Sequence, residues 1–373
     1  MASVPNDYVY LDYAATAPLC EEAAEAMAPY QVPGRANLAV GGNANSLHGP
    51  GRAAFAALEE ARRSIARDLG ARRPDGIVFT SGATEADDAA LLGIAQAAAD
   101  ERRRRGAGDF VPHVVVTAVE HDAVLAPAKR LESQGFRVTR LAPNRQGFIE
   151  ERALEAALDA DTVLVSVQAA NSEVGSIQPI ADLARVAHDH AALFHTDAVQ
   201  ALGKARVNLQ ELDVDAASFS AHKVGGPKGA GALYLRARTP FHAYAIGGGQ
   251  EGGRRSGTQN VAGIVGFAAA VHAATAMQEA EAARLRVLRD RLYERLGAID
   301  AVEATVDVAP GSEDFLPNIV HVLVDGLESE TLILRFDMQG FGVSGGSACS
   351  SHSLEPSHVL RSLGIDDDRA HGA

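Results

Sequence analysis

Two residues of this chain could together hold and activate an aldehyde cofactor. Lys223 lies in the Gly-rich run Ser220–Gly229, and Asp197 precedes that run at the end of an apolar stretch. A lysine amine can bind such a cofactor as a Schiff base, and a buried carboxylate can keep a pyridine nitrogen protonated, so that the ring works as an electron sink. The pair therefore indicates a pyridoxal phosphate site, whereas either residue alone is more typical of a solvated turn or a strand end.

A cysteine in a segment rich in Gly and Ser is the second chemical feature. Cys349 lies within Ser344–Ser353, and the chain has only two cysteines. A thiolate reacts when it is partly exposed and when nearby positive charge favours it, and a loop of this composition supplies the exposure. The alternative is a small buried hydrophobe, which the lack of apolar periodicity around Cys349 disfavours. Cys20 lies in an apolar stretch and is interpreted as structural.

A third feature could bind phosphate. The run from Ser81 to Thr84 follows a short apolar strand and opens a helical pattern. Free N–H groups and the positive end of a helix meet at such a turn. A capping role for Thr84 with Asp87 explains the same residues equally well. His121 and Gln200 also follow apolar stretches, and taken singly they are typical of a strand end and of a helix surface.

The elements that must position these residues alternate along the chain. Short β-branched runs are expected to form strands, and longer Ala-, Leu- and Arg-rich segments between them are expected to form helices. This order predicts an α/β protein with a mostly parallel sheet covered by helices on both faces, and ligands at the strand ends. We expect strands at 77–80, 114–117, 162–167 and 192–195, and helices near 50–69, 84–105, 122–134, 180–191 and 261–297.

Length and charge narrow the function further. A chain of 373 residues exceeds the usual size of a single core, so we expect a large domain over 15–260 and a smaller α+β domain formed by 1–14 and 261–373. With 48 acidic and 34 basic residues the formal net charge is −14, which disfavours nucleic acid or an anionic membrane as partner. The sequence shows neither a basic leader followed by an apolar core nor an apolar run of 18 residues. We therefore expect a cytoplasmic protein. Two distant cysteines form neither a disulfide framework nor a metal motif.

Ordered motifs along nearly the whole chain resemble the cysteine desulfurases of the iron–sulfur cluster assembly type (NifS/IscS-like). These belong to the class V aminotransferase group of fold-type I pyridoxal phosphate enzymes. The motifs that carry the resemblance are Leu11–Thr16, Gly42–His48, Phe79–Glu85, Glu120–His121, Asn171–Gly175, His195–Gln200, Ser220–Gly229, Arg255–Thr258, Ser347–Ser351 and Leu354–Leu360.

The resemblance implies a role for each candidate residue. Lys223 would carry pyridoxal 5'-phosphate, Asp197 would hold the ring nitrogen, and His121 would stack on the ring and assist proton transfer. Gln200 would bind the ring hydroxyl, and Ser172 stands where the family usually has an asparagine near the cofactor. The phosphate would be held by Ala83, Thr84, Ser220 and His222, with Thr258 reaching the phosphate of a partner subunit, which implies a homodimer.

The activity implied is removal of sulfur from L-cysteine. Lys223 would act as the base at the α-carbon, Cys349 would attack the substrate sulfur, and the products would be L-alanine and a persulfide for delivery to an acceptor protein. Asp88 and Ser172 depart from the family pattern, and no residue here matches the arginine that binds the substrate carboxylate in the family. A selenocysteine lyase, or a slow scaffold for sulfur transfer that lacks this arginine, therefore stays open as an alternative.

Overall fold

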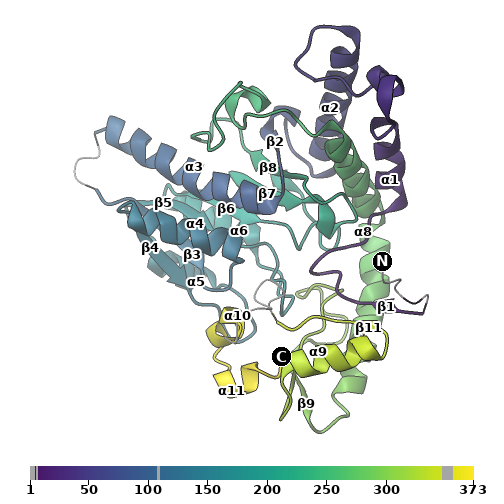
Figure 1. Ribbon diagram of the computed structural model, residues 1–373. Coiled ribbons are helices and arrows are strands. Elements are labelled where there is room, and N and C mark those ends of the chain that lie inside the picture. The colour runs from purple at the N-terminus through teal and green to yellow at the C-terminus, as the bar shows by residue number, and fades with distance from the viewer. Residues whose placement is uncertain (1–4, 6, 107–109, 347–355) are drawn as a thin grey trace.

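A seven-stranded sheet forms the centre of the computed structural model, which describes residues 5, 7–106, 110–346 and 356–373 (Figure 1). The strand order is β2-β8-β7-β6-β5-β3-β4. All but one of the strands run parallel, and β8 is antiparallel to both of its neighbours. The mostly parallel sheet predicted from the sequence is therefore confirmed. The strands are β2 Ile77–Thr80, β3 His113–Thr117, β4 Arg137–Leu141, β5 Thr162–Ser166, β6 Leu193–Asp197, β7 Ala216–Ser220 and β8 Gly231–Leu235.

Helices cover both faces of this sheet, as the near-continuous apolar strands require. Every residue of β2, β3, β5, β7 and β8 is buried. Separate apolar clusters fill the two faces, one beneath α2 and α6 and one beneath α3 and α4. These helices are α2 Gly49–Asp68, α3 Ala83–Arg104, α4 Asp122–Ser133 and α6 Ile180–Asp189, close to the ranges expected from the sequence. The shorter helices are α1 Glu21–Met27, α5 Glu151–Ala157 and α7 Leu209–Leu212.

The parallel strands place their carboxyl ends along one edge of the sheet. Ligands of open α/β sheets bind at this edge, because loops and helix N-termini converge there. The segments that follow β2, β3, β5, β6 and β7 carry nearly all of the candidate site residues. The chain order of the strands therefore gathers residues that are more than 130 positions apart in sequence, such as Thr84 and Lys223.

A smaller part of the molecule lies below the sheet in Figure 1. It contains two two-stranded sheets, one pairing β1 Val9–Tyr10 with β11 Phe341–Gly342 and one pairing β9 Val302–Ala304 with β10 Val322–Val324. The helices α9 Ser329–Met338, α10 His358–Ser362 and α11 Asp367–Ala370 complete it, around an apolar cluster that includes Leu323 and Leu360. The boundaries predicted for two domains stay predictions.

A single long helix, α8 Val261–Leu296, runs from the large sheet region into the smaller part (Figure 1). Its first turns bury Phe267 and Val271 in the core, and it packs along α1 and α2. An 18-residue window of α8 has a mean hydropathy of 1.5, so by length and composition alone it could cross a membrane. The helix contains polar residues such as His272, Thr275 and Gln278, so it has no uninterrupted apolar run of 18 residues. In addition, 44% of the window is buried, and a core helix meets the same criterion.

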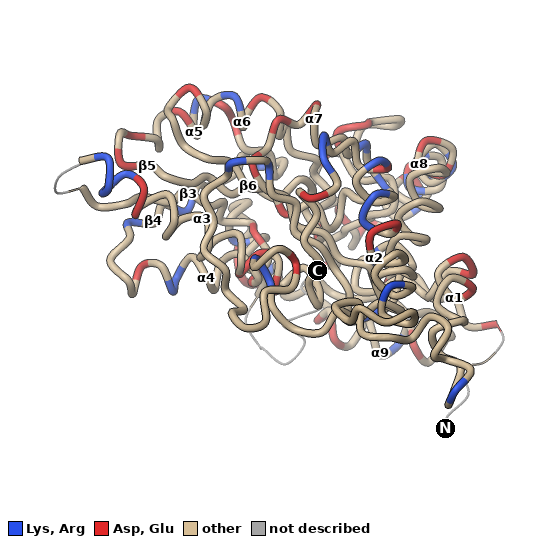
Figure 2. Tube along the Cα trace, turned by 90° about the horizontal axis from the view of Figure 1, so that it is seen from above, with Lys and Arg blue, Asp and Glu red and all other residues tan. Residues whose placement is uncertain are grey.

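Short 3-10 helices complete the described structure: η1 Ala28–Tyr30, η2 Gly34–Ala39, η3 Pro74–Gly76, η4 Ala221–Lys223 and η5 Glu251–Gly253. Acidic and basic positions are mixed along the described trace, without one basic face (Figure 2). The excess of acidic residues gives the whole chain a formal net charge of −14.

Candidate functional site

Lys223 and Gln200 meet at the N-terminal segment of the chain. The Lys223 Nζ donates hydrogen bonds to the carbonyl oxygens of Ala14 at 2.6 Å and Ala15 at 3.0 Å. Gln200 Nε2 donates to the same Ala14 carbonyl at 3.0 Å. Lys223 belongs to η4, which directly follows β7, and Gln200 follows β6. Two residues predicted to contact one cofactor therefore share one backbone acceptor.

Asp197 ends strand β6 and is only 8% exposed. One of its carboxylate oxygens accepts a hydrogen bond from the Val199 N–H at 2.9 Å. Burial raises the pKa of Asp197, while the charges of His121 and Lys223 act in the opposite direction. These two predicted site residues thus lie within electrostatic reach of the buried carboxylate. The structure brings together the three residues on which the sequence argument depends.

His121 lies at the edge of the sheet, at the start of α4. Its Nδ1 accepts a hydrogen bond from the Ala123 N–H at 3.0 Å and so caps the helix. Because Nδ1 is an acceptor, a neutral ring carries its proton on Nε2. The side chain is exposed rather than part of the core, which contradicts the interpretation of His121 as an ordinary core histidine.

The turn after β2 presents free N–H groups. Helix α3 begins at Ala83, and its N-cap residue Gly82 gives no side-chain cap. Thr84 lies inside the first turn, so the capping role considered for Thr84 with Asp87 is wrong. A side chain at Gly231 of β8 would come within 2.7 Å of the Gly82 Cα, so this neighbour must be a glycine. The uncapped start of a 22-residue helix is a favourable place for a phosphate group.

His222 and Ser220 lie on either side of Ala221 after β7. The His222 Nδ1 and the Thr16 hydroxyl share a hydrogen bond of 3.2 Å, and the Ala17 N–H donates to the His222 carbonyl at 2.8 Å. Burial and the charge of Lys223 lower the pKa of His222 to about 4, so its ring is neutral near pH 7. Ser220 is 2% exposed. The N-terminal segment therefore closes over the lysine loop.

Ser172 is half-buried in the turn after β5. Its neighbour Asn171 binds the backbone N–H groups of Glu173 and Val174 through its side-chain oxygen, both at 2.9 Å. The same Asn171 donates to the Val119 carbonyl at 3.3 Å, beside the segment that carries His121. The turn is thus fixed next to the site, and Ser172 lies in it.

Cys349 lies outside the described residues. The described residues on either side of its segment both approach Glu173. Ser357 donates a hydrogen bond of 2.6 Å to the Glu173 carboxylate, and a Cβ at Gly346 would lie 3.0 Å from the same oxygen. His358 shares a hydrogen bond of 2.9 Å with the Glu120 carbonyl. The flank that begins at Ser357 is therefore hydrogen-bonded to the edge of the sheet, and Gly346 on the other flank lies close to the same Glu173 carboxylate.

Thr258 lies apart from this cluster, exposed in the loop that precedes α8. The neighbouring Gln259 accepts a hydrogen bond from Asn45 at 3.0 Å. Leu47, on the same stretch as Asn45, is 90% exposed. The predicted reach of Thr258 to the phosphate of a partner subunit stays a prediction.

Two buried acids near the site carry a signal that the sequence reasoning missed. Asp87 in α3 is fully buried, and neither carboxylate oxygen has a hydrogen-bond partner of ordinary geometry among the described residues. Burial raises its pKa well above the usual range, and the Asp197 charge adds to this effect. Burial also raises the pKa of Glu120 to about 8. The Asp at 87 follows a small residue in a helical pattern, so its sequence gives no sign that it faces Asp197.

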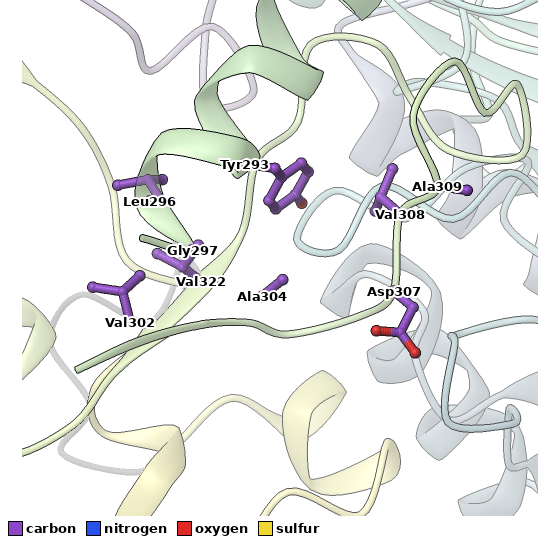
Figure 3. Close-up of a pocket in the computed structure, with 9 residues that line it drawn as sticks. All are labelled: Tyr293, Leu296, Gly297, Val302, Ala304, Asp307, Val308, Ala309 and Val322. Atoms are coloured by element: carbon purple, nitrogen blue, oxygen red, sulfur yellow. The ribbon is translucent and has the colours of Figure 1, made fainter. Parts of the chain in front are cut away.

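Other features of the described structure give no second site of this kind. A cavity of about 320 Å³ lies in the smaller part, between the end of α8 and β9, and its lining is mostly apolar (Figure 3). None of the predicted site residues lines it. Among the described residues, no group of three or more His, Cys, Asp or Glu side chains could hold a metal ion.

Comparison with known proteins adds independent information. The family model described as Aminotransferase class-V matches residues 9–368. A cysteine desulfurase IscS from Dictyoglomus turgidum is 42% identical over 365 residues, which cover 98% of this chain and 88% of that protein.

Solved structures agree in fold. A structure described as a NifS-like protein superposes with a TM-score of 0.85 at 36% identity, covering 98% of this chain and 92% of the other. A structure described as SspA in complex with cysteine gives a TM-score of 0.80 at 32% identity, covering 98% and 96%. The match therefore extends over the sheet region and the smaller part alike.

Proposed function

We propose that this chain, which belongs to the class-V aminotransferase family and within it to the IscS-like cysteine desulfurases, converts L-cysteine to L-alanine and retains the sulfur on Cys349 as a persulfide. The observation that carries the proposal is the meeting of Lys223, His121 and Asp197 at one edge of the sheet, where Asp197 is buried and both other residues act on its charge. The cofactor of this activity would be pyridoxal 5'-phosphate.

The residues present fit that cofactor. The carboxylate of Asp197 is buried where it would accept a hydrogen bond from a protonated ring nitrogen, and the Gln200 side-chain oxygen is buried without a partner among the described residues. The start of α3 offers uncapped N–H groups from Ala83 and Thr84 for the phosphate. Pyridoxal phosphate, when bound, supplies an electron sink that stabilises negative charge on the substrate α-carbon.

Proton movement would be the task of the chain's own side chains. The Lys223 amine would remove the α-proton, because its backbone acceptors hold Nζ at a fixed place beside the site. His121 would exchange protons through Nε2, since its Nδ1 is occupied by the Ala123 N–H. Asp197 would hold the proton on the ring nitrogen as an ionised carboxylate, which the charges of Lys223 and His121 favour.

Sulfur transfer would take place at Cys349. Its thiolate would form an S–S bond with the substrate sulfur while the bond between that sulfur and the β-carbon breaks. The electron pair of that bond stays with the alanine fragment, which takes up a proton, so no external oxidant or reductant is needed. The hydrogen bond from Ser357 to Glu173 and the closeness of Gly346 to the same carboxylate support this role, because they bring both flanks of the cysteine segment near the edge of the sheet.

We also propose a cytoplasmic homodimer that delivers sulfur to an acceptor protein. Exposed large apolar side chains support the dimer: Leu47 is 90% exposed and Ile246 is 85% exposed. Burial of such side chains against a second subunit would remove apolar surface from water. In the dimer, Thr258 would reach the phosphate in the partner subunit. Sedimentation at micromolar concentration tests the dimer directly.

The activity is tested by measuring alanine formed from L-cysteine by the purified chain with pyridoxal phosphate and a thiol reductant. We expect alanine and sulfide in equal amounts, and we expect Cys349→Ala to lose both while it keeps the absorption band of the bound cofactor. Lys223→Ala should lose that band as well. A chain that binds the cofactor but forms no alanine would instead support a sulfur-transfer scaffold.

Turnover of L-selenocysteine tests the remaining alternative, which is a selenocysteine lyase. A selenocysteine lyase would form alanine from L-selenocysteine even as the Cys349→Ala variant, because selenium can leave at the elemental level and the thiol reductant of the assay then converts it to selenide. A desulfurase that depends on Cys349 should turn over L-cysteine only with the thiol present. Retained cysteine activity in Cys349→Ala would overturn the assigned role of this residue.

A further inference from the structure

The loop between β8 and α8, residues 249–259, is held in a conformation that few sequences adopt. Its backbone has positive φ angles at Gly249, Glu251, Gly252, Gly253 and Gly257. Four of these are glycines, but Glu251 at φ 52° is a residue with a side chain, for which this region costs about 1 kcal/mol or more. Such a conformation persists only where the surroundings fix it, so the contacts of Glu251 are informative.

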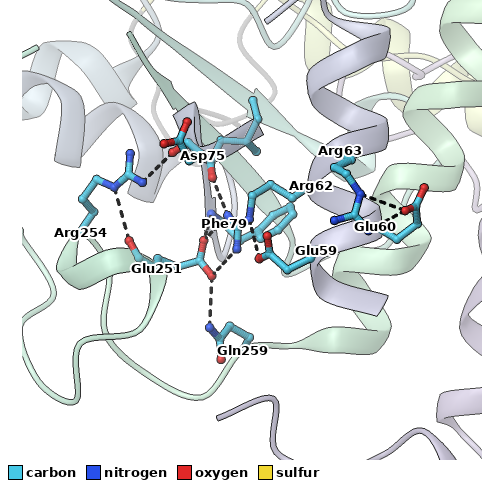
Figure 4. A network of polar contacts seen from close by, with 10 residues as sticks. Glu59, Glu60, Arg62, Arg63, Asp75, Phe79, Glu251, Arg254 and Gln259 are labelled. Atoms are coloured by element: carbon cyan, nitrogen blue, oxygen red, sulfur yellow. Dashed lines mark hydrogen bonds and ion pairs between the residues drawn. The ribbon is translucent and has the colours of Figure 1, made fainter. Parts of the chain in front are cut away.

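The first anchor of the loop is the buried Glu251 carboxylate (Figure 4). It accepts hydrogen bonds from Arg62 at 2.7 and 3.1 Å, from the Phe79 N–H at 3.0 Å and from Gln259 at 3.2 Å. Arg62 comes from α2, and its guanidinium also lies 4.7 Å from the centre of the Phe79 ring. Phe79 is in β2, the strand that leads directly into the turn proposed to bind phosphate. The anchor therefore joins the loop to that strand.

The second anchor of the loop is the ion pair between Arg255 and Glu85. Arg255 donates to the Glu85 carboxylate at 2.7 and 3.2 Å, and the Ser81 N–H donates to the same carboxylate at 2.7 Å. Ser81 is the first residue after β2, and Glu85 lies in the first turn of α3. One carboxylate thus connects the 249–259 loop to the phosphate turn of its own subunit.

Thr258 lies directly between two anchored neighbours. The Gly257 N–H donates to the Gln250 side chain at 2.9 Å, and Gln259 is bound to both Glu251 and Asn45. The position of Thr258 therefore depends on the same anchors that fix the phosphate turn. A displacement of either anchor would move Thr258 and the turn together.

We propose that the Arg255–Glu85 ion pair is a positioning element shared by two cofactor sites. It holds Ser81 and the start of α3 for the phosphate of its own subunit, and it holds the 249–259 loop so that Thr258 reaches the phosphate of the partner. This inference rests on the proposed homodimer and its pyridoxal phosphate sites. One surface-accessible ion pair then adjusts cofactor retention on both sides of the dimer interface.

Mixed dimers test the inference. In the first arm, one subunit carries Arg255→Gln and Lys223→Ala, and the other is wild type. Only the wild-type Lys223 can then be labelled by pyridoxal phosphate and borohydride, and mass spectrometry gives the labelled fraction at each cofactor concentration. In the second arm, Arg255→Gln is placed in the subunit that keeps Lys223, opposite a Lys223→Ala subunit.

We expect the cofactor concentration for half-labelling to rise about five- to tenfold in both arms, the low end of typical couplings between sites. The matched control is Arg140→Gln, which breaks a similar two-bond pair with Glu132 far from the loop and should leave both values unchanged. Glu85→Gln should repeat the effect of Arg255→Gln, because the amide can still accept from Ser81 but the charge pair is lost.

The outcomes separate the inference from the function on which it rests. A rise in only one arm would overturn the shared role, since the ion pair would then serve one site alone. Unchanged values in both arms of a dimeric protein would overturn the inference but not the dimer. A holoprotein that sediments as a monomer would overturn both, while labelling of Lys223 in the wild-type chain would still report the cofactor site.

Discussion

The buried ion pair of Arg62 and Glu251 and the buried acids beside Asp197 show two ways of placing charge inside this protein. Glu251 has four donors around it, including both arms of the Arg62 guanidinium. Asp87 has no hydrogen-bond partner of ordinary geometry among the described residues, and the neighbouring His195 stays 3.6 Å away. The buried Glu251 carboxylate therefore finds its hydrogen-bond donors within the chain, whereas the buried Asp87 carboxylate does not find them among the described residues.

The difference shows which region is built for a ligand. A buried charge without partners costs several kcal/mol, and a chain tolerates it where a proton or a cationic group compensates. Burial favours the protonated form of Asp87 by raising its pKa, and burial raises the pKa of Glu120 to about 8. Burial also raises the pKa of Asp197, and the protonated ring nitrogen of the proposed cofactor would supply a positive charge beside its carboxylate. The fully hydrogen-bonded pair of Arg62 and Glu251 positions a loop. The buried acids beside Asp197 lie where the proposed cofactor would bind.

Arg62→Ala should have the largest effect, because it leaves the Glu251 carboxylate buried without its cation. Loss of one partner of a buried pair costs about 3–5 kcal/mol. We expect the urea midpoint of the apoprotein, followed by far-UV circular dichroism, to fall by the corresponding amount. The double variant Arg62→Met with Glu251→Leu should be less destabilised than Arg62→Ala alone. A loss below about 1 kcal/mol in Arg62→Ala would contradict the view that the pair is structural.

Asp197→Asn should lower the activity and not the stability, which is the opposite of the effect expected for Arg62→Ala. The amide oxygen can still accept from the Val199 N–H, and the variant removes a carboxylate that has no full partner in the apoprotein. We expect the apoprotein to be as stable as the wild type or more so, while alanine formation falls on the order of 100-fold or more, since the protonated ring nitrogen loses the anionic carboxylate that stabilises it. Lower apoprotein stability together with full activity would show that Asp197 belongs to the structural class of buried charge.

The pH dependence of the apoprotein offers a milder test at Glu120. Its folded pKa of about 8 lies above the ordinary value of 4.5, so the folded state binds a proton that the unfolded state has lost in this window. The contribution of Glu120 to the free energy of unfolding is fully present below about pH 4.5. It decreases as the pH rises through 8, by at most about 1.4 kcal/mol per pH unit. Glu120→Gln should flatten the slope of the urea midpoint between pH 5 and 8. An unchanged slope would place the titration elsewhere.

The sequence was sufficient for elements whose pattern is local. Ile77–Thr80 and His113–Thr117 are β-branched runs in the buried sheet, and their strands formed close to the expected ranges. Strand β7 escaped prediction because Ala216–Ser220 is rich in Ala and Ser, which have little β propensity. Strand β4 escaped because it is a partly exposed edge with two arginines.

The site followed the same division. Asp197 was found because it ends an apolar stretch, and Lys223 because it lies in a Gly-rich run, two features that are readable along the chain. The Ala14 carbonyl that binds Lys223 and Gln200 could not be found, since a backbone oxygen leaves no trace in residue type. The burial of Asp87 likewise depends on α3 packing against β6 and β7, which are distant in sequence.

Arg63→Gln should have the smallest effect and so define the scale for the comparison. Arg63 is the neighbour of Arg62 in α2, and it forms two hydrogen bonds to Glu60 at 2.7 and 3.1 Å (Figure 4). Its side chain is 52% exposed, whereas that of Arg62 is 9% exposed. Exposed pairs of this spacing contribute about 0.3–0.5 kcal/mol, because water and salt screen them. The urea midpoint should therefore move by less than about a tenth of the change in Arg62→Ala, and it should move less still in high salt. Equal losses in the two variants would show that helix α2, rather than the burial of charge, accounts for the effect at Arg62.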